Sequence, residues 1–162
     1  MILSSSRSNI CVNGVAGSTI HSERGLRQGD PLSPLLFDLA ADVFSKILKL
    51  GCAEGIISGF GSDHVVGGIN SLQYADDTII FSKPDCKYLA ALKFILYAFE
   101  RLSGLKNNFH KSSVYTLGCS DDLRRSCAEM FNCKAEVFPL NYLGMYIRPK
   151  KLMKKDWQHL IE

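Results

Sequence analysis

The chain has 162 residues, of which 46% are hydrophobic and 22% charged, a balance typical of a folded domain with its own core. No apolar run approaches the roughly 18 residues that cross a bilayer, and the first residues contain no secretory signal. The net charge of +3 is too small to identify a protein that binds nucleic acid. These values argue against a disordered, a membrane-spanning or an exported chain.

Six cysteines are scattered along the chain, with no CxxC pair and no spacing common in zinc sites. Because the sequence shows no export signal, we expect an intracellular chain whose thiols are reduced and mostly buried.

The first predicted element is a small β-hairpin over residues 10–15. Apolar residues flank Asn13-Gly14, a pair that suits a tight turn because both central residues need positive φ. A loop punctuated by glycine and proline follows over residues 24–34.

A helix is predicted over about residues 34–50, with Pro34 in its first turn and Gly51 at its exit. Its sequence has one apolar and one charged face. The apolar face holds Leu36, Ala40, Val43, Phe44 and Ile47. The charged face holds Asp38, Asp42, Lys46 and Lys49. The glycine-rich stretch over residues 51–68 is predicted to hold short strands and turns.

Residues 72–81 are predicted to form two short strands around Asp76-Asp77, because the flanks are apolar and β-prone. A second helix should run from a cap at Asp85 to about Leu102, with Gly104 at its exit. The residues that this helix should bury are Leu92, Ile95, Phe99 and Leu102.

Three shorter elements complete the prediction. They are a strand over residues 113–117, a helix capped by Ser120 that runs through Phe131, and a final strand or hairpin over residues 140–147. Helices and strands are mixed without regular alternation, which predicts an α+β fold.

Two adjacent carboxylates, Asp76 and Asp77, lie between apolar strands, where aspartate is disfavoured. A solvated turn would explain an isolated pair. The alternative is a divalent-cation site, because Mg²⁺ prefers oxygen ligands and is often held by one or two carboxylates plus substrate phosphates. Successive side chains of a strand point to opposite faces, so a two-ion site would need at least one more carboxylate from a neighbouring strand.

Four sequence blocks, in order, resemble those of one family. Residues 73–77 (QYADD) resemble the YADD motif of reverse transcriptases, and residues 24–34 (RGLRQGDPLSP) resemble their preceding RQGDPLSP block. Residues 103–112 (SGLKNNFHKS) are similar to the next block, and residues 142–144 (YLG) to the primer-grip hairpin. The residues of these blocks resemble those of LINE-type, non-LTR retrotransposon enzymes, particularly those of plants. The resemblance covers about Val12 to Glu162 and implies a partial polymerase palm, an antiparallel sheet whose YADD hairpin packs against helices.

The resemblance implies RNA-directed DNA polymerisation with two Mg²⁺ ions, or Mn²⁺ in their place. The partners would be an RNA template, a DNA primer and deoxynucleoside triphosphates. Asp76 and Asp77 would be catalytic metal ligands, and Lys111, with Lys106 as the competing candidate, would act at the triphosphate. The nucleotide and template site would be lined by Arg27, Gln28, Gly29, Pro31 and Tyr74.

The C-terminal part of the resemblance concerns the primer and the nucleic-acid backbone. Tyr142, Leu143 and Gly144 would hold the primer strand. Residues 1–147 would be palm with remnants of the fingers, and residues 148–162 would be the basic start of the thumb. The residues that would meet backbone phosphates are Arg148, Lys150, Lys151, Lys154 and Lys155. A solvated surface segment is the simpler explanation of this basic run.

The chain departs from the family in one respect that bears on catalysis. The family has an earlier strand with another catalytic aspartate, but none of the residues before Arg24 is an aspartate. Asp38 and Asp42 do not substitute easily, since they lie on the polar face of the predicted helix. The lost strand would also leave an unpaired sheet edge beside Leu72 and Phe81, which a partner protein could fill by strand addition.

Three functions stay open at this point. The chain is a polymerase domain that is truncated or complemented in trans, a decayed retroelement remnant without activity, or a non-catalytic module that binds RNA or a primer–template duplex. A nuclease is a more distant alternative, because paired carboxylates with Mg²⁺ also hydrolyse phosphodiesters. A nuclease has no evident need for the RQGDPLSP and YLG blocks.

Overall fold

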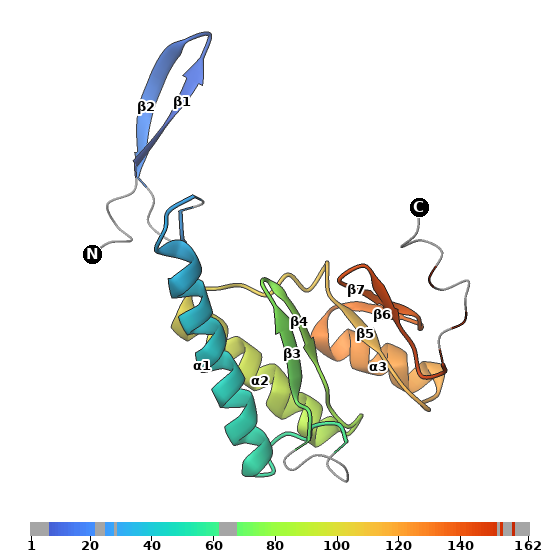
Figure 1. Ribbon diagram of the computed structural model, residues 1–162. Helices are drawn as coiled ribbons and strands as arrows, with labels where there is room; N and C mark the ends of the chain where they lie inside the picture. The colour runs from blue at the N-terminus through green and yellow to red at the C-terminus, as the bar shows by residue number, and fades with distance from the viewer. Residues whose placement is uncertain are drawn as a thin grey trace. The chain divides into compact units, whose positions relative to one another are not determined.

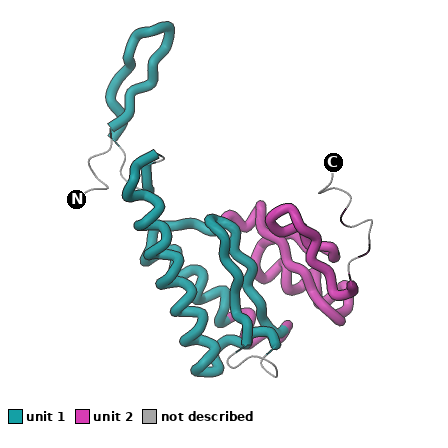
Figure 2. Tube along the Cα trace, in the orientation of Figure 1, with its two compact units in different colours: residues 1–83, 91–107 teal, residues 84–90, 108–162 magenta. Residues whose placement is uncertain are grey.

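The computed structural model describes residues 7–21, 25–27, 29–61, 68–151, 153 and 157. The chain divides into two compact units (Figure 2). Unit 1 consists of Met1–Lys83 and Ala91–Asn107, and unit 2 consists of Pro84–Ala90 and Asn108–Glu162. None of the helices in the described ranges is long and apolar enough to cross a membrane.

Unit 1 contains two antiparallel hairpins and a long helix (Figure 1). The elements are β1 (Arg7–Val12), β2 (Val15–His21), α1 (Ser33–Ala53), β3 (Ser71–Tyr74) and β4 (Asp77–Ile80), followed by most of α2 (Cys86–Ser103). Unit 2 contains the first turn of α2, then β5 (Ser113–Tyr115), α3 (Asp121–Phe131), β6 (Lys134–Glu136), β7 (Leu140–Tyr142) and β8 (Met145–Ile147). Strands β5 and β6 pair in parallel, and β7 pairs with β8 in antiparallel orientation. The predicted α+β fold with a YADD hairpin is confirmed.

The first hairpin has the predicted turn. Asn13 and Gly14 both have positive φ, 51° and 81°, as the tight connection between β1 and β2 requires. All residues of both strands are exposed to solvent. The hairpin therefore owes its order to its own ladder and to the bond from Asn9 Nδ2 to the Gly17 carbonyl, 2.9 Å long.

Helices α1 and α2 supply the core of unit 1. Phe44 and Leu48 of α1 are buried, and the Phe44 and Phe99 ring centroids lie 4.7 Å apart. A Cβ on Gly51 would approach Ile57 Cγ1 to 3.2 Å. Gly51 therefore allows close packing inside α1, and the predicted helix exit at this residue is wrong, because α1 continues to Ala53.

The predicted apolar face of α1 is only partly correct. Phe44 is buried, but Leu36 and Val43 are exposed, and the fully buried side chain is Leu48. Apolar residues occur on more than one side of this helix, so the spacing alone did not identify the side that α2 covers.

In the second helix, α2, the predicted cap is confirmed but the predicted burial is only partly correct. Asp85 Oδ1 accepts a bond from the Lys87 backbone N–H at 2.8 Å, as expected of its capping role. Leu92 is buried as predicted, together with Leu89 and Leu96. Leu102 is 82% exposed, so its predicted burial is wrong. It lies in the last turn of α2, and the backbone then leaves the helix at Gly104 with φ of 77°.

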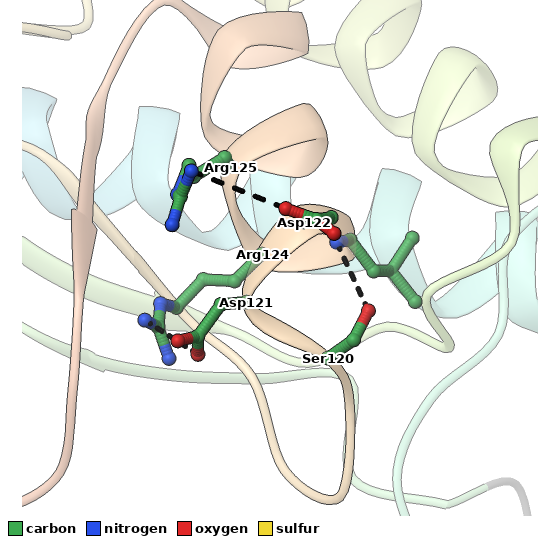
Figure 3. Close-up of polar contacts among 6 residues, drawn as sticks. Ser120, Asp121, Asp122, Arg124 and Arg125 are labelled. Carbon is green, nitrogen blue, oxygen red and sulfur yellow. Dashed lines mark hydrogen bonds and ion pairs between the residues drawn. The ribbon is translucent and has the colours of Figure 1, made fainter.

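Unit 2 is organised by α3, which contacts both β5 and β6. Ser120 Oγ accepts from the Leu123 backbone N–H at 3.3 Å, and Arg124 pairs with Asp121 at 2.9 Å (Figure 3). The helix ends at Asn132, whose φ of 55° is left-handed. The predicted cap and both predicted ends of this helix are confirmed, whereas β6 was not predicted.

All six cysteines are free thiols, as predicted. Only Cys127 is buried, so the expectation of mostly buried thiols is wrong. Burial raises the pKa of the Cys127 thiol, and the negative charges that Cys119 and Cys86 can carry add to the effect. The Cys127 thiol is therefore held in its protonated form.

Replacing Leu48 by alanine should lower the free energy of unfolding by about 2–5 kcal/mol, because it leaves a cavity at a side chain with no exposed surface. Leu50→Ala is the matched control, since Leu50 lies in the same helix with 64% of its surface exposed. Its effect should stay within about 0.5 kcal/mol. Denaturant unfolding followed by circular dichroism measures both values, and equal losses would contradict the packing of α1.

Replacing Ser120 by alanine should lower the free energy of unfolding by about 1 kcal/mol, since the Leu123 N–H loses its acceptor at the start of α3. Ser120→Asp keeps an acceptor and should restore most of the loss. Thermal unfolding of the three proteins provides the comparison. If the Ser120→Asp protein unfolds at the same temperature as the Ser120→Ala protein, the capping role is refuted.

Candidate active-site hairpin and associated motifs

The two candidate catalytic aspartates lie at the end of the β3–β4 hairpin. Tyr74 pairs with Asp77 as the last pair of the ladder, which leaves Ala75 and Asp76 as a two-residue turn. Ala75 has a φ of 48°, in the left-handed region that an alanine side chain disfavours. Asp76 is therefore at the tip, and Asp77 is the first residue of β4.

Both carboxylates are available to a ligand. Asp76 and Asp77 are exposed, and neither carboxylate makes a hydrogen bond or ion pair within the part of the chain that the structure describes. Among the same residues, no group of three or more His, Cys, Asp or Glu side chains is placed to hold a metal ion. The hairpin thus offers two carboxylates, fewer than a two-ion site needs. The described residues by themselves do not fit the pair of Mg²⁺ ions that the family implies.

An open hollow of about 250 Å³ lies beside the hairpin, between α1 and β3. Its lining from α1 includes Asp38 and Asp42, and its lining from the hairpin consists of Gln73 and Ala75. Asp42 Oδ2 is paired with Lys46 Nζ at 2.6 Å. The sequence assigned Asp38 and Asp42 to a polar face, and only the packing of α1 beside β3 brings them next to Ala75.

The RQGDPLSP block forms a compact turn that starts α1. The Arg27 carbonyl accepts from Ser33 Oγ at 2.6 Å, and Asp30 Oδ1 accepts from the Leu32 backbone N–H at 2.8 Å. Gly29 has a φ of 84° and open space where a Cβ would stand. Arg27, Gly29 and Pro31 are exposed. Gln28 lies outside the described residues.

The SGLKNNFHKS block ends α2 and begins unit 2. Ser103 Oγ donates to the Phe99 carbonyl at 2.7 Å, and Glu100 Oε1 accepts from the Asn107 N–H at 2.6 Å. Asn108 Oδ1 accepts from the Lys111 N–H at 3.2 Å, which holds the following turn. The Lys106 and Lys111 side chains are both exposed, so the geometry favours neither as the cation near a triphosphate.

The YLG block forms the turn between β7 and β8. Tyr142 pairs with Met145, and Leu143 and Gly144 have φ values of 54° and 77°. A leucine in this conformation is strained, as Ala75 is in the other hairpin. The tip of the candidate primer-holding hairpin is therefore exposed and tightly turned.

The basic segment after β8 is partly described. Arg148 Nε and Nη2 donate to the carbonyls of Lys150 and Lys151, each at 3.4 Å, so its guanidinium folds back on its own segment. Lys150 and Lys151 are exposed. Lys154 and Lys155 lie outside the described residues.

The predicted site residues are divided between the two units. Unit 1 holds Tyr74, Asp76 and Asp77 together in one hairpin, with Arg27, Gly29 and Pro31 in the turn before α1. Unit 2 holds Lys111, the YLG turn and the basic segment. Sequence reasoning missed the role of Ala75, because nothing in its type announces a left-handed backbone.

Comparison with known proteins is consistent with these motifs. Residues 2–147 match the family of reverse transcriptases (RNA-dependent DNA polymerases). An uncharacterized mitochondrial protein of Arabidopsis thaliana is 40% identical over 67 residues, which cover 41% of this chain and 55% of that protein. The retrovirus-related Pol polyprotein of a type-2 retrotransposable element of Drosophila melanogaster is 28% identical over 137 residues, which cover 85% of this chain and 11% of that protein.

The chain therefore spans about half the length of one relative and about a ninth of the other. The matched region contains all four motif blocks, including the YADD hairpin and the YLG turn. On this evidence the chain belongs to the reverse transcriptase family.

Proposed function

We propose that this chain is a segment of an RNA-directed DNA polymerase domain that provides the YADD hairpin but does not polymerise by itself. The observation that carries the proposal is the exposed pair Asp76 and Asp77 at the hairpin tip, with no third carboxylate in the described ranges placed to hold a metal ion with them. A further aspartate-bearing strand, from a longer product or from another polypeptide, would complete the set.

The physical reason is electrostatic. Two divalent cations a few ångströms apart repel each other strongly, and the ligating carboxylates must offset that repulsion. With only Asp76 and Asp77, the ions would bind weakly and the primer hydroxyl would not be held in place. In a complete site Asp76 and Asp77 would help to hold the metal ions, which would supply charge stabilisation for nucleotidyl transfer.

The remaining residues take the roles that the family suggests. Arg27, Gln28, Gly29, Pro31 and Tyr74 would contact nucleotide and template, and Lys111 would offset charge on the departing pyrophosphate. Tyr142, Leu143 and Gly144 would support the primer end. The exposed and left-handed turns at Gly29 and at Leu143-Gly144 favour close approach of backbone to a nucleic acid.

A second candidate function is binding without catalysis. The exposed Lys150 and Lys151, next to Arg148, support it, because a basic run meets backbone phosphates without reading sequence. This function needs no metal ion and would persist in a decayed copy of the gene.

Polymerase activity should depend on an added strand. The purified chain, given a primed RNA template, deoxynucleoside triphosphates and Mg²⁺ or Mn²⁺, should extend the primer no faster than its Asp76→Asn variant. A version lengthened at its N-terminus by an aspartate-bearing strand of a related enzyme should gain extension, which Asp76→Asn should abolish. Extension by the chain alone, removed by Asp76→Asn, would overturn the proposal.

Binding through the basic segment should be strongly salt-dependent. Each phosphate contact contributes a slope of about −0.9 to the logarithm of affinity against the logarithm of salt concentration. Replacing Lys150 and Lys151 by glutamine should flatten the slope measured by fluorescence anisotropy on a duplex. The matched control replaces the exposed Lys49 and Lys87, and it removes the same charge. If both pairs of substitutions change the slope equally, only net charge matters and the basic segment is not the site.

A further inference from the structure

One edge of strand β3 is open over the part of the chain that the structure describes. The Phe81 N–H donates to the Asn70 carbonyl at 2.9 Å, which sets the phase of the ladder with β4. In antiparallel pairing, alternate residues turn their backbone groups toward and away from the partner strand. Leu72 and Tyr74 therefore face β4 like Asn70, whereas Ser71 and Gln73 direct their N–H and C=O groups to the opposite edge.

That opposite edge already pairs with another segment at Ile69, two residues before Ser71. The Ile69 N–H donates to the Phe60 carbonyl at 2.7 Å, and the Phe60 N–H donates to the Ile69 carbonyl at 2.8 Å. A Cβ on Gly59 would stand 3.0 Å from the Ile69 carbonyl oxygen, so the two backbones are in close contact. The edge thus pairs at Ile69, and the next two outward positions, Ser71 and Gln73, have no backbone partner among the described residues.

The vacant part of the edge borders the hollow between α1 and β3. Gln73 belongs to both, and the α1 side of the hollow offers Phe37, Ala41 and two carboxylates. Asp42 is neutralised by Lys46 at 2.6 Å. Asp38 is exposed, and its carboxylate makes no hydrogen bond or ion pair to any residue that the structure describes. An extended segment on this edge would lie beside one uncompensated negative charge.

We propose that the β3 edge and the α1 hollow together form a strand-addition site for an extended basic peptide. The peptide backbone bonds to Ser71 and Gln73, and a lysine or arginine side chain meets Asp38 over Phe37 and Ala41. The unpaired carboxylate of Asp38 repels both an acidic peptide and a nucleic-acid phosphate. This proposal does not rest on the polymerase proposal.

The first test uses a fluorescent, capped peptide that alternates lysine and valine, with the complete chain as receptor. Anisotropy should show saturable binding, and a peptide with glutamate in place of lysine should not bind. Methylating the peptide backbone nitrogens that face β3 should abolish binding, whereas methylating the alternate nitrogens should not. Equal affinity for the lysine and glutamate peptides, or an affinity that backbone methylation does not change, would overturn the proposal. This test alters only the peptide, so it does not depend on the folding of a variant protein.

The second test uses matched variants of the protein. Gln73→Pro removes an outward N–H without breaking the ladder, and should abolish binding. Thr78→Pro makes the same change on the outward side of β4, because Thr78 is paired with Gln73, and should leave binding intact. Asp38→Asn should weaken binding roughly two- to fivefold. Amide spectra of each variant confirm that the hairpin remains folded.

The outcomes separate the alternatives. Loss of binding with Thr78→Pro but not with Gln73→Pro would move the site to the β4 edge and overturn the assignment. Failure of the peptide to bind, together with a dimer in sedimentation that Gln73→Pro dissociates, would assign the edge to a second copy of this chain. If Asp38→Asn binds the lysine peptide with unchanged affinity, the Asp38 carboxylate does not select a basic peptide and the proposed occupant is wrong.

Discussion

The two-residue turn at Ala75 and Asp76 is the constraint on which the candidate chemistry depends. Because the Tyr74–Asp77 pair closes the ladder, Asp76 has to stand at the tip and Asp77 has to begin β4. The turn is possible only with a left-handed backbone at Ala75, an unfavourable conformation for alanine. A protein tolerates such a conformation when the surrounding ladder imposes it. The position of both carboxylates is thus determined by hydrogen bonding in β3 and β4.

The same hairpin also carries backbone groups and carboxylates that have no partner among the described residues. A sheet of two strands has two open edges, and exposed edges bind further strands. The β3 edge is paired at Ile69 and, among the described residues, has no backbone partner at Gln73, which lines the same hollow as Asp38. The carboxylate pair itself is exposed and unshared within the described ranges. Both features leave the hairpin able to accept a further chain segment.

Several local features followed directly from residue types. Asn13-Gly14 predicted a turn with two positive φ values, Asp85 and Ser120 predicted helix caps, and the apolar flanks of Asp76 predicted a hairpin. Each depends on neighbours in sequence, where backbone preference and side-chain hydrogen bonding act over a few residues. Burial was less predictable. Leu102 has the right spacing for a core position but lies in the last turn of α2, and Gly51 resembled a helix exit but serves close packing against Ile57.

The sequence by itself therefore determined the family, the α+β fold class and the local turn and caps at Asn13-Gly14, Asp85 and Ser120. These depend on motifs and on local backbone preferences. The tertiary structure alone decided that Leu48 rather than Leu36 fills the core, and that Asp38 lies beside Gln73 and Ala75 across a hollow. The reason is that packing selects one side of a helix and one edge of a strand. Those choices depend on contacts between segments far apart in the chain, which periodicity along α1 and β3 does not encode.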